Sequence, residues 1–377
     1  MNEKLRIAAF GFRTLPPSKG AAGADKFALE LLPRLVKMGH SVVAYNRRYP
    51  DVFVDIKEYK GVIIKTFKTL KFKGYDTLLH SFKCTCDIIF NNTADIVHIQ
   101  NGGNSIWALP LRVFGKKVFI SQDGVDWKRD KWPWYGKFYL KFSAYLTSVL
   151  PNQVIFDNIF ARKIFEDRFN KKFEFIPFGS EIENVSPNNA ILDKYQLIPG
   201  DYYLFVGRFI PDKGLHYLLP AFNQSNSSRK LVLIGGSPNP SPYEQELIEM
   251  ANNKVVFAGF VYGDDVIRLM QNAYCYIQPS DVEGLSPVIL SIMGLNVPLI
   301  VSDIKENLYA VQDFAIKFNK GTINSLVEKI NFVENNYPIV KALAFEAQKR
   351  ALTNFNWEKV TEDHVKVFNG GKLTAVI

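Results

Sequence analysis

Short apolar runs alternate with stretches of helical periodicity in the first half of the chain. Phe27, Leu31 and Leu35 recur every four residues, which predicts a helix over residues 24–38 that ends at Gly39. Continuous apolar strands that alternate with helices are typical of a parallel sheet covered on both faces. The predicted strands are Leu5–Phe10, Ser41–Tyr45, Val62–Phe67, Ile96–Ile99, Lys117–Ser121 and Val154–Phe156.

The same pattern begins again near residue 202 and predicts a second sheet. Prolines and asparagines interrupt it in residues 179–200, where we place the hinge. A chain of 377 residues exceeds the usual size of one domain. We therefore expect an α/β protein with domains at 1–185 and 186–355 and a helical segment at 356–377. The strands predicted for the second sheet are Tyr203–Val206, Leu231–Ile234, Val255–Phe257, Tyr274–Ile277 and Leu299–Ser302.

The composition is that of a globular protein. It is 47% hydrophobic and 22% charged, and no run approaches the roughly 20 apolar residues that a membrane-spanning helix needs. The apolar run near the N-terminus is too short for the core of a signal peptide. Of the three cysteines, Cys84, Cys86 and Cys275, the first two are too close in sequence for a good disulfide and lack the spacing of a zinc knuckle. We therefore expect a cytoplasmic protein with free thiols.

The charge differs between the two halves. Residues 1–180 contain 29 Lys and Arg against 16 Asp and Glu, a net charge of +13, while the remainder has a net charge of −4. Such asymmetry indicates that the first half faces an anionic partner. Nucleic acid, anionic lipid and a phosphorylated substrate all meet this description.

Two cations lie at a predicted junction between a strand, a loop and a helix. The strand ends in Gly207, Arg208 follows at once, and Lys213 opens the next helix. Arginine offers a planar fork of donors and lysine a compact charge, and together they match a diphosphate near a helix N-terminus. The alternative is two surface cations on a loop.

A second motif follows the strand at 274–277. Ser286 and Pro287 suit the N-cap and the first position of a helix, so the backbone N–H groups of Leu285 and Ser286 would face an anion. Glu283 can accept hydrogen bonds from sugar hydroxyls. Asp281 with Glu283 could alternatively hold a metal ion, but we expect none, since two nearby cations already neutralise a diphosphate.

Small residues fill the loop between the first strand and the first helix. Gly11, Gly20 and Gly23 let a backbone approach a phosphate closely. The loop lacks the G-x-G-x-x-G fingerprint, which disfavours a nicotinamide dehydrogenase.

With these motifs in place, the chain resembles the retaining GT-B glycosyltransferases that carry an E-x7-E motif. The resemblance implies two Rossmann-like domains with parallel sheets facing across a cleft, and a closing helix that packs back on the first domain. It implies that Arg208 and Lys213 bind the diphosphate of a nucleotide sugar and that Glu283 contacts the sugar. Gly23 would face the phosphates, and Val261, in Gly259-Phe260-Val261, would lie beside the nucleobase.

The segment from Asp123 to Trp132 is similar to bacterial rhamnosyltransferases of cell-wall, capsule or O-antigen polysaccharide biosynthesis. That similarity implies dTDP-rhamnose as donor and a polyprenyl-diphosphate sugar as acceptor. Asp123 would orient the acceptor or steady the transition state, or else it is a turn residue before Gly124. Lys128 and Arg129 would contact the acceptor diphosphate.

One residue departs from the family pattern. The second Glu of the motif falls at position 291, where this chain has Ser291. In the family this carboxylate holds the ribose hydroxyls. A deoxyribose donor has no 2′-OH, so the serine is compatible with dTDP-rhamnose; a different donor pose or weakened activity fits it equally.

Aromatic and basic residues are interleaved in residues 116–141, which contain seven Lys and Arg, and residues 57–73 add six lysines. This mixture suits an anionic lipid surface, and we expect peripheral association with the inner face of the membrane.

The alternatives to a rhamnosyltransferase are a UDP- or GDP-hexose transferase, a nucleotide-sugar epimerase and, in another class, a nucleic-acid-binding protein. No nucleic-acid-binding signature occurs, so we expect no such partner.

Overall fold

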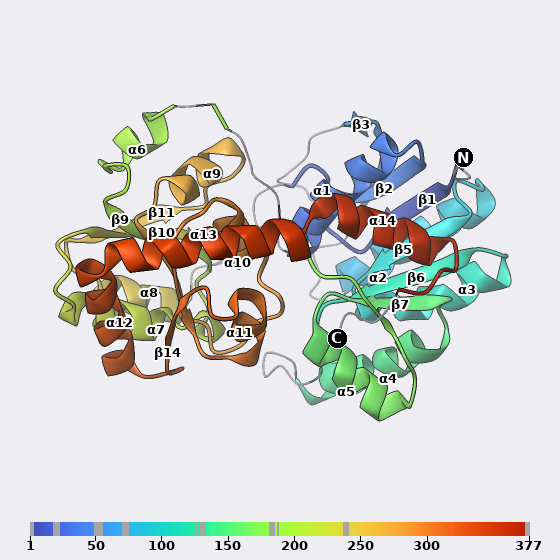
Figure 1. Ribbon diagram of the computed structural model, residues 1–377. Coiled ribbons are helices and arrows are strands. Elements are labelled where there is room, and N and C mark those ends of the chain that lie inside the picture. Colours follow the sequence, from blue (N-terminus) through green and yellow to red (C-terminus); the bar gives the residue numbers. More distant parts are fainter. Residues whose placement is uncertain are drawn as a thin grey trace. The chain divides into compact units, whose positions relative to one another are not determined.

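The computed structural model describes residues 4–17, 23–48, 56–69, 75–125, 127, 133–180, 185–186, 188–236 and 241–373. The chain forms two compact units, and each contains one sheet (Figure 1). Residues 1–177 and 357–377 form the first unit, and residues 178–356 form the second.

The sheet of the first unit has eight strands in the order β3-β4-β2-β1-β5-β6-β7-β8. All the pairings are parallel except the one between β3 and β4, which corrects the expectation of a purely parallel sheet. The strands are β1 (Arg6–Phe10), β2 (Ser41–Arg48), β3 (Glu58–Tyr59), β4 (Val62–Lys68), β5 (Ile96–Gln100), β6 (Lys117–Gln122), β7 (Gln153–Phe156) and β8 (Glu174–Phe175). The helices are α1 (Gly23–Lys37), α2 (Tyr75–Phe90), the 3₁₀ helix η1 (Gly102–Trp107), α3 (Ala108–Val113), α4 (Trp134–Val149), α5 (Ile159–Phe169) and α14 (Trp357–Phe368).

Both faces of this sheet are buried, because successive side chains of a strand point to opposite faces. On β5, Val97 and Ile99 join the core formed with α2 and α3. His98 points the other way and meets Phe27 of α1 and Phe368 of α14. The continuous apolar strands read from the sequence therefore arise from burial on both sides.

The last helix, α14, belongs to the first unit. Trp357 and His364 pack against the ring of Phe27 with centroids 6.0 and 5.5 Å apart. The first unit itself ends earlier than the predicted boundary at 185. Ser180 already belongs to the second unit, where its hydroxyl donates to the Leu290 carbonyl at 2.7 Å.

The sheet of the second unit has six parallel strands in the order β11-β10-β9-β12-β13-β14. They are β9 (Tyr202–Arg208), β10 (Lys230–Gly236), β11 (Val255–Gly259), β12 (Cys275–Gln278), β13 (Leu299–Ser302) and β14 (Ile316–Phe318). The helices are α6 (Ala190–Lys194), η3 (Pro211–Lys213), α7 (Leu215–Gln224), α8 (Pro242–Met250), α9 (Asp264–Gln271), α10 (Pro287–Gly294), α11 (Lys305–Val311), α12 (Ile323–Asn335) and α13 (Tyr337–Asn354).

The core of the second unit lies between its sheet and the helices α7, α8 and α12. Phe205 and Leu233 of the sheet pack with Leu218, Leu247 and Ile330 of these helices, and all five are fully buried. The strand order reverses at β9 and β12, which are neighbours although the chain visits β10 and β11 between them. Sheets of this kind bind ligands beside such a reversal, at the carboxyl ends of the strands.

Candidate functional site

The two predicted diphosphate cations follow β9. Arg208 is the last residue of that strand and is exposed. Lys213 lies in the 3₁₀ turn η3, and α7 begins only at Leu215, so the expectation that Lys213 opens the helix is wrong. Gly214 at φ +69° separates the two elements and ends the 3₁₀ turn.

The loops after β9 and β12 are fastened to each other. The Asp212 carbonyl accepts hydrogen bonds from the backbone N–H groups of Asp281 at 2.9 Å and Val282 at 3.4 Å. A Cβ on Gly214 would lie 2.1 Å from the Pro279 carbonyl oxygen. Glycine is therefore required here both for its left-handed backbone and for the close approach of the second loop.

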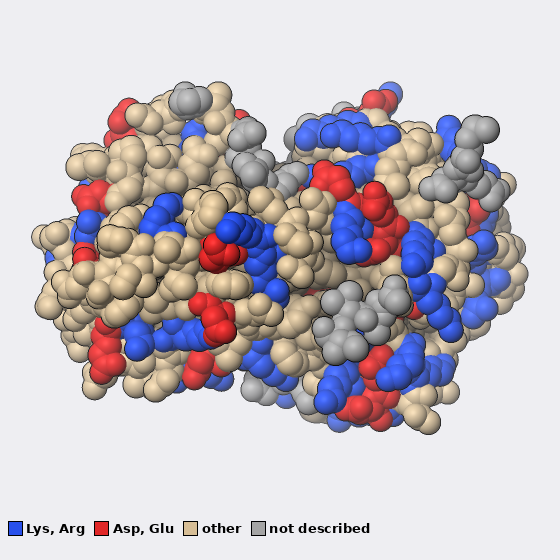
Figure 2. Space-filling model, in the orientation of Figure 1, with Lys and Arg blue, Asp and Glu red and all other residues tan. Residues whose placement is uncertain are grey.

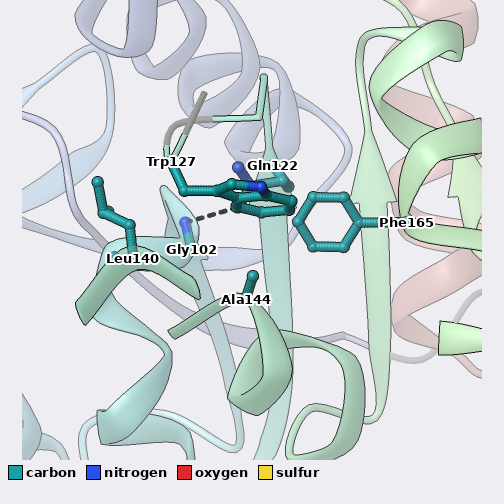
Figure 3. Close-up of a pocket in the computed structure, with 7 residues that line it drawn as sticks. Gly102, Gln122, Trp127, Leu140, Ala144 and Phe165 are labelled. Atoms are coloured by element: carbon teal, nitrogen blue, oxygen red, sulfur yellow. Dashed lines mark hydrogen bonds between the residues drawn. The ribbon is translucent and has the colours of Figure 1, made fainter. Parts of the chain in front are cut away.

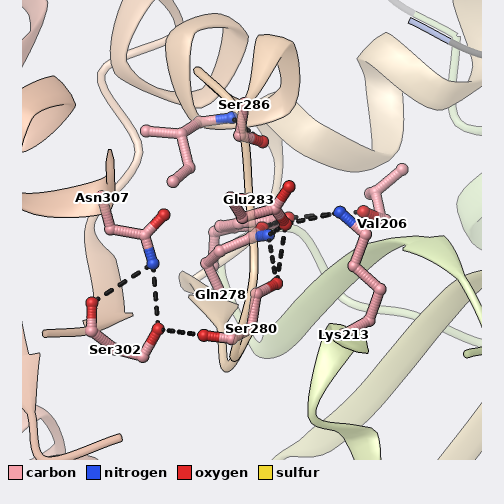
Figure 4. A network of polar contacts seen from close by, with 10 residues as sticks. Val206, Lys213, Gln278, Ser280, Glu283, Ser286, Ser302 and Asn307 are labelled. Atoms are coloured by element: carbon pink, nitrogen blue, oxygen red, sulfur yellow. Dashed lines mark hydrogen bonds and ion pairs between the residues drawn. The ribbon is translucent and has the colours of Figure 1, made fainter. Parts of the chain in front are cut away.

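Glu283 is the centre of a polar network at this edge of the sheet (Figure 4). Its Oε1 accepts from Lys213 Nζ and Gln278 Nε2, each at 2.5 Å, and from Ser280 Oγ at 2.7 Å. The Tyr276 hydroxyl donates to Gln278 Oε1 at 2.5 Å, which orients the amide so that its nitrogen faces Glu283. Burial, with the Glu283 charge nearby, raises the pKa of Tyr276 and keeps it a donor.

A second layer supports this network. Ser302 Oγ donates to the Ser280 carbonyl at 2.6 Å, and Asn307 Nδ2 donates to Ser302 Oγ at 3.0 Å. The Glu283 side chain is only 8% exposed, and that of Lys213 is 19% exposed. In the described ranges no three His, Cys, Asp or Glu side chains are grouped to hold a metal ion, and Glu283 contacts a lysine.

Ser286 caps α10, as its sequence position predicted. Its hydroxyl accepts from Ile289 N–H at 3.5 Å, and Pro287 is the first helical residue. Ser286 and the adjacent Leu285 are both buried. Ser291 lies in the second turn of the same helix and is half-buried. Val261, also half-buried, follows β11 at the same sheet's edge. The binding roles of these residues remain predictions.

The glycine loop of the first unit is held by a residue whose role the sequence did not reveal. Asp25 is buried, and its Oδ1 accepts from the backbone N–H groups of Arg13 at 2.7 Å and Thr14 at 3.1 Å. Gly11 has φ +108°, and a Cβ there would lie 2.1 Å from the Gln100 carbonyl oxygen. Gly23 is the first residue of α1 and is exposed.

Asp123 follows β6 in the first unit, and its side chain is exposed. The preceding Gln122 joins two loops: its Oε1 accepts from Gly102 N–H at 3.0 Å, and its Nε2 donates to the Gly124 carbonyl at 2.5 Å. A small pocket lies beside these loops, with Trp127, Gly102 and Gln122 among its lining residues (Figure 3). Lys128 and Arg129 fall outside the described residues.

Two separate parts of the chain match different family profiles. Residues 194–350 match the family described as "Glycosyl transferases group 1". Residues 91–181 match a domain of unknown function, DUF1972. The first match contains Arg208, Lys213 and the Glu283 network, and the second contains Asp123.

Two curated relatives are glycosyltransferases of surface polysaccharides. The capsular polysaccharide biosynthesis glycosyltransferase CapM of Staphylococcus aureus is 25% identical over 48% of this chain and 50% of its own length. The O-antigen chain mannosyltransferase C of Escherichia coli is 25% identical over 53% of this chain and 55% of its own length. The chain thus spans about half the length of each of these relatives.

Solved structures match nearly the whole chain. Sucrose-phosphate synthase from Thermosynechococcus elongatus superposes with a TM-score of 0.81 at 17% identity, over 97% of this chain and 98% of that one. Anabaena HepE in complex with UDP and glucose has a TM-score of 0.80 at 16% identity, over 97% and 100%. This chain therefore has the GT-B fold, and residues 194–350 of its second unit are similar to the glycosyl transferases group 1 family.

Proposed function

We propose that this protein is a glycosyltransferase that moves a sugar from a nucleoside diphosphate to a growing surface polysaccharide. The contact between Lys213 and Glu283 supports the proposal most, because a cation that would bind the donor diphosphate lies beside a carboxylate that would accept from sugar hydroxyls. The names of the capsular and O-antigen relatives support the polysaccharide as product.

The proposed reaction proceeds with retention. The bond from the anomeric carbon to the leaving diphosphate breaks, and the acceptor oxygen bonds to the same face. Arg208, Lys213 and the N-terminus of α10 stabilise the charge that grows on the diphosphate. A β-phosphate oxygen takes the acceptor proton. Asp123 orients the acceptor or stabilises the positive charge on the sugar in the transition state.

We propose dTDP-rhamnose as the donor, and Ser291 is the residue that supports it. A serine cannot supply the carboxylate that binds a ribose 2′-OH, and a deoxyribose has no such hydroxyl. Ser291→Glu should therefore strengthen UDP binding by about tenfold, the effect of one hydrogen bond to a charged group, and leave dTDP binding nearly unchanged.

The proposed acceptor is a saccharide carried on a polyprenyl diphosphate. The basic first half of the chain, at +13, suits such a doubly anionic group, and Lys128 and Arg129 are the proposed contacts. A UDP- or GDP-hexose is the second candidate donor, since HepE binds UDP and glucose and one relative is a mannosyltransferase.

A transfer and hydrolysis screen over dTDP-, UDP- and GDP-sugars with a lipid-linked acceptor tests the reaction. Turnover of dTDP-rhamnose with the anomeric configuration retained is the expected result. Turnover of a UDP- or GDP-hexose alone would replace the donor assignment, and no turnover of any nucleotide sugar would contradict the proposed function.

A further inference from the structure

The helix α4 carries large aromatic side chains on its solvent-exposed side. Trp134 is 81% exposed and Phe138 is 72% exposed. Helical spacing brings these two residues to the same side as Phe142 and Tyr145, at intervals of three and four residues. We call this set, with Tyr135, the aromatic surface; all five of its side chains are exposed.

The opposite side of α4 is small and polar. Ser143, Ala144, Thr147 and Ser148 are buried. Ser143 Oγ donates to the Gly102 carbonyl at 2.5 Å, and Ser105 Oγ of η1 donates to the Ser143 carbonyl at 2.8 Å. A surface helix of a globular protein has the reverse arrangement, with apolar residues inward and polar residues outward. These buried hydrogen bonds hold α4 in this orientation.

Exposed apolar side chains also occur on α3, which is near α4. The 3₁₀ helix η1 contacts both α4 and α3. Leu109, Val113 and Phe114, on and just after α3, are exposed as well. Large apolar side chains that gather on one exposed side of a helix, as on α4, mark an interaction site rather than an ordinary solvated face.

The sequence segments that form this area are basic. Residues 96–122 and 133–156 contain no Asp or Glu. They contain Arg112, Lys116, Lys117, Lys137 and Lys141, and Lys141 lies on the exposed side of α4 beside the aromatic surface. Acidic side chains occur on the neighbouring α5, which carries Glu166 and Asp167, and in the area over α14 (Figure 2). The partner is therefore expected to be apolar and anionic.

We propose that the aromatic surface docks the protein on an anionic lipid bilayer, with α4 lying in the headgroup region. Trp and Tyr favour that region because they combine an apolar ring with a polar group. Lysines beside an interfacial helix add attraction to anionic headgroups. No helix in the described part of the chain combines the length and apolar character needed to cross a bilayer, so docking is peripheral at this surface. The proposal does not depend on the reaction proposed above.

Vesicle flotation tests the docking surface. The probes are vesicles of phosphatidylcholine alone and of phosphatidylcholine mixed with phosphatidylglycerol, at low salt. The wild-type chain should float with the anionic vesicles. Replacing Phe138 and Phe142 together by Ser should lower the partition coefficient by about tenfold or more. Replacing Ile339 and Phe345, exposed residues of α13, by Ser provides the matched control and should change little.

The charge contribution is measured separately. Lys141→Glu should weaken binding to anionic vesicles by about fivefold or more and leave neutral vesicles unaffected. Lys163→Glu, on the exposed side of α5, makes the same change in net charge and should have a smaller effect. The emission of Trp134, taken as the difference from Trp134→Phe, should shift to the blue on binding.

Three results would overturn the proposal. The first is the absence of wild-type binding to vesicles at low salt. The second is equal vesicle binding by the Phe138/Phe142 variant and the α13 control. The third is a wild-type protein that is dimeric and does not bind lipid, with a Phe138/Phe142 variant that is monomeric. The last result would assign the surface to a second copy of the chain. Because the substituted side chains are exposed, thermal unfolding of the variants should match that of the wild type.

Discussion

Lys213, on the turn after β9, is ion-paired with Glu283, on the loop after β12, at 2.5 Å. The two residues are 70 positions apart in the sequence and were expected to bind different parts of one ligand. Their contact joins the proposed diphosphate and sugar positions into one site. Gln278 and Ser280 donate to the same carboxylate oxygen, so Glu283 is held in place by three donors.

Glu283→Gln should impair sugar transfer more than nucleotide binding. The amide retains the shape but cannot act as a charged acceptor for sugar hydroxyls and for three protein donors. We expect kcat to fall by about 100-fold, the effect of removing one preorganised polar contact from a transition state. The affinity for free dTDP should change by less than about threefold, since Lys213 is retained. A variant with wild-type kcat would contradict the role of Glu283.

Gly214→Ala should disturb the site through the loop after β12. The new Cβ would lie 2.1 Å from the Pro279 carbonyl oxygen, at φ +69°. Gly200→Ala is the control, because Gly200 has a similar φ of +74° and nothing within 4 Å of its Cβ. Chemical denaturation should show a loss in Gly214→Ala that exceeds the loss in the control by about 1–3 kcal/mol. Equal losses would show that only the backbone conformation matters.

Asp123→Asn should fold normally, because the side chain is exposed. We expect its turnover to fall by about 100-fold or more, as is typical when a positioned acid or base is removed. Circular dichroism and the melting temperature confirm folding, and steady-state transfer measures turnover. A folded variant with wild-type turnover would contradict the catalytic role of Asp123 and leave it with a structural role in the turn before Gly124.

Acid should destabilise the first unit through its buried histidines. Burial lowers the pKa of His98 to about 3 and that of His364 to about 4. In the unfolded chain both pKa values return to about 6.5, so the unfolded state binds more protons below that pH. The stabilisation is complete above pH 6.5 and is lost as the pH falls toward 4. Each histidine should contribute a slope of about 1.4 kcal/mol per pH unit.

His364→Phe tests this assignment. The variant removes one of the two titrating groups from the interface between α14 and the sheet. The free energy of unfolding, measured by denaturant between pH 6 and about pH 4.5, should then depend less steeply on pH, by about one proton. An unchanged dependence of the unfolding free energy on pH would show that other groups cause the loss of stability in acid.

Part of the local structure of the second unit could be predicted from the sequence. Ser286 and Pro287 form the predicted helix start, and the strand from Leu299 to Ser302 has the predicted bounds. These features depend on residues that are close together in the sequence, so the order of residues along the chain is enough to predict them. The hairpin of β3 and β4 was missed, although Lys60 and Gly61 both adopt the positive φ of a tight turn.

The contacts that hold the site could not be predicted in the same way. Gln278 and Tyr276 act through a hydrogen-bond chain to Glu283 that exists only once two loops meet. Asp25 acts on backbone N–H groups 11 and 12 residues away. Residues 116–141 were predicted to suit a lipid surface, but only the structure shows that Trp134 and Phe138 share one exposed side of α4, whereas Phe119 and Trp127 are buried.

The central claim is that the second unit binds a nucleoside diphosphate through Arg208 and Lys213. Calorimetric titration of dTDP and UDP into the wild type, Arg208→Ala and Lys213→Met tests it most directly. Lys317→Met is the control, since Lys317 also forms a lysine–carboxylate pair, with Asp313 at 2.7 Å. We predict that Kd rises at least about tenfold in the first two variants and is unchanged in the control. Equal Kd values in all four proteins, or no binding to the wild type, would contradict the account.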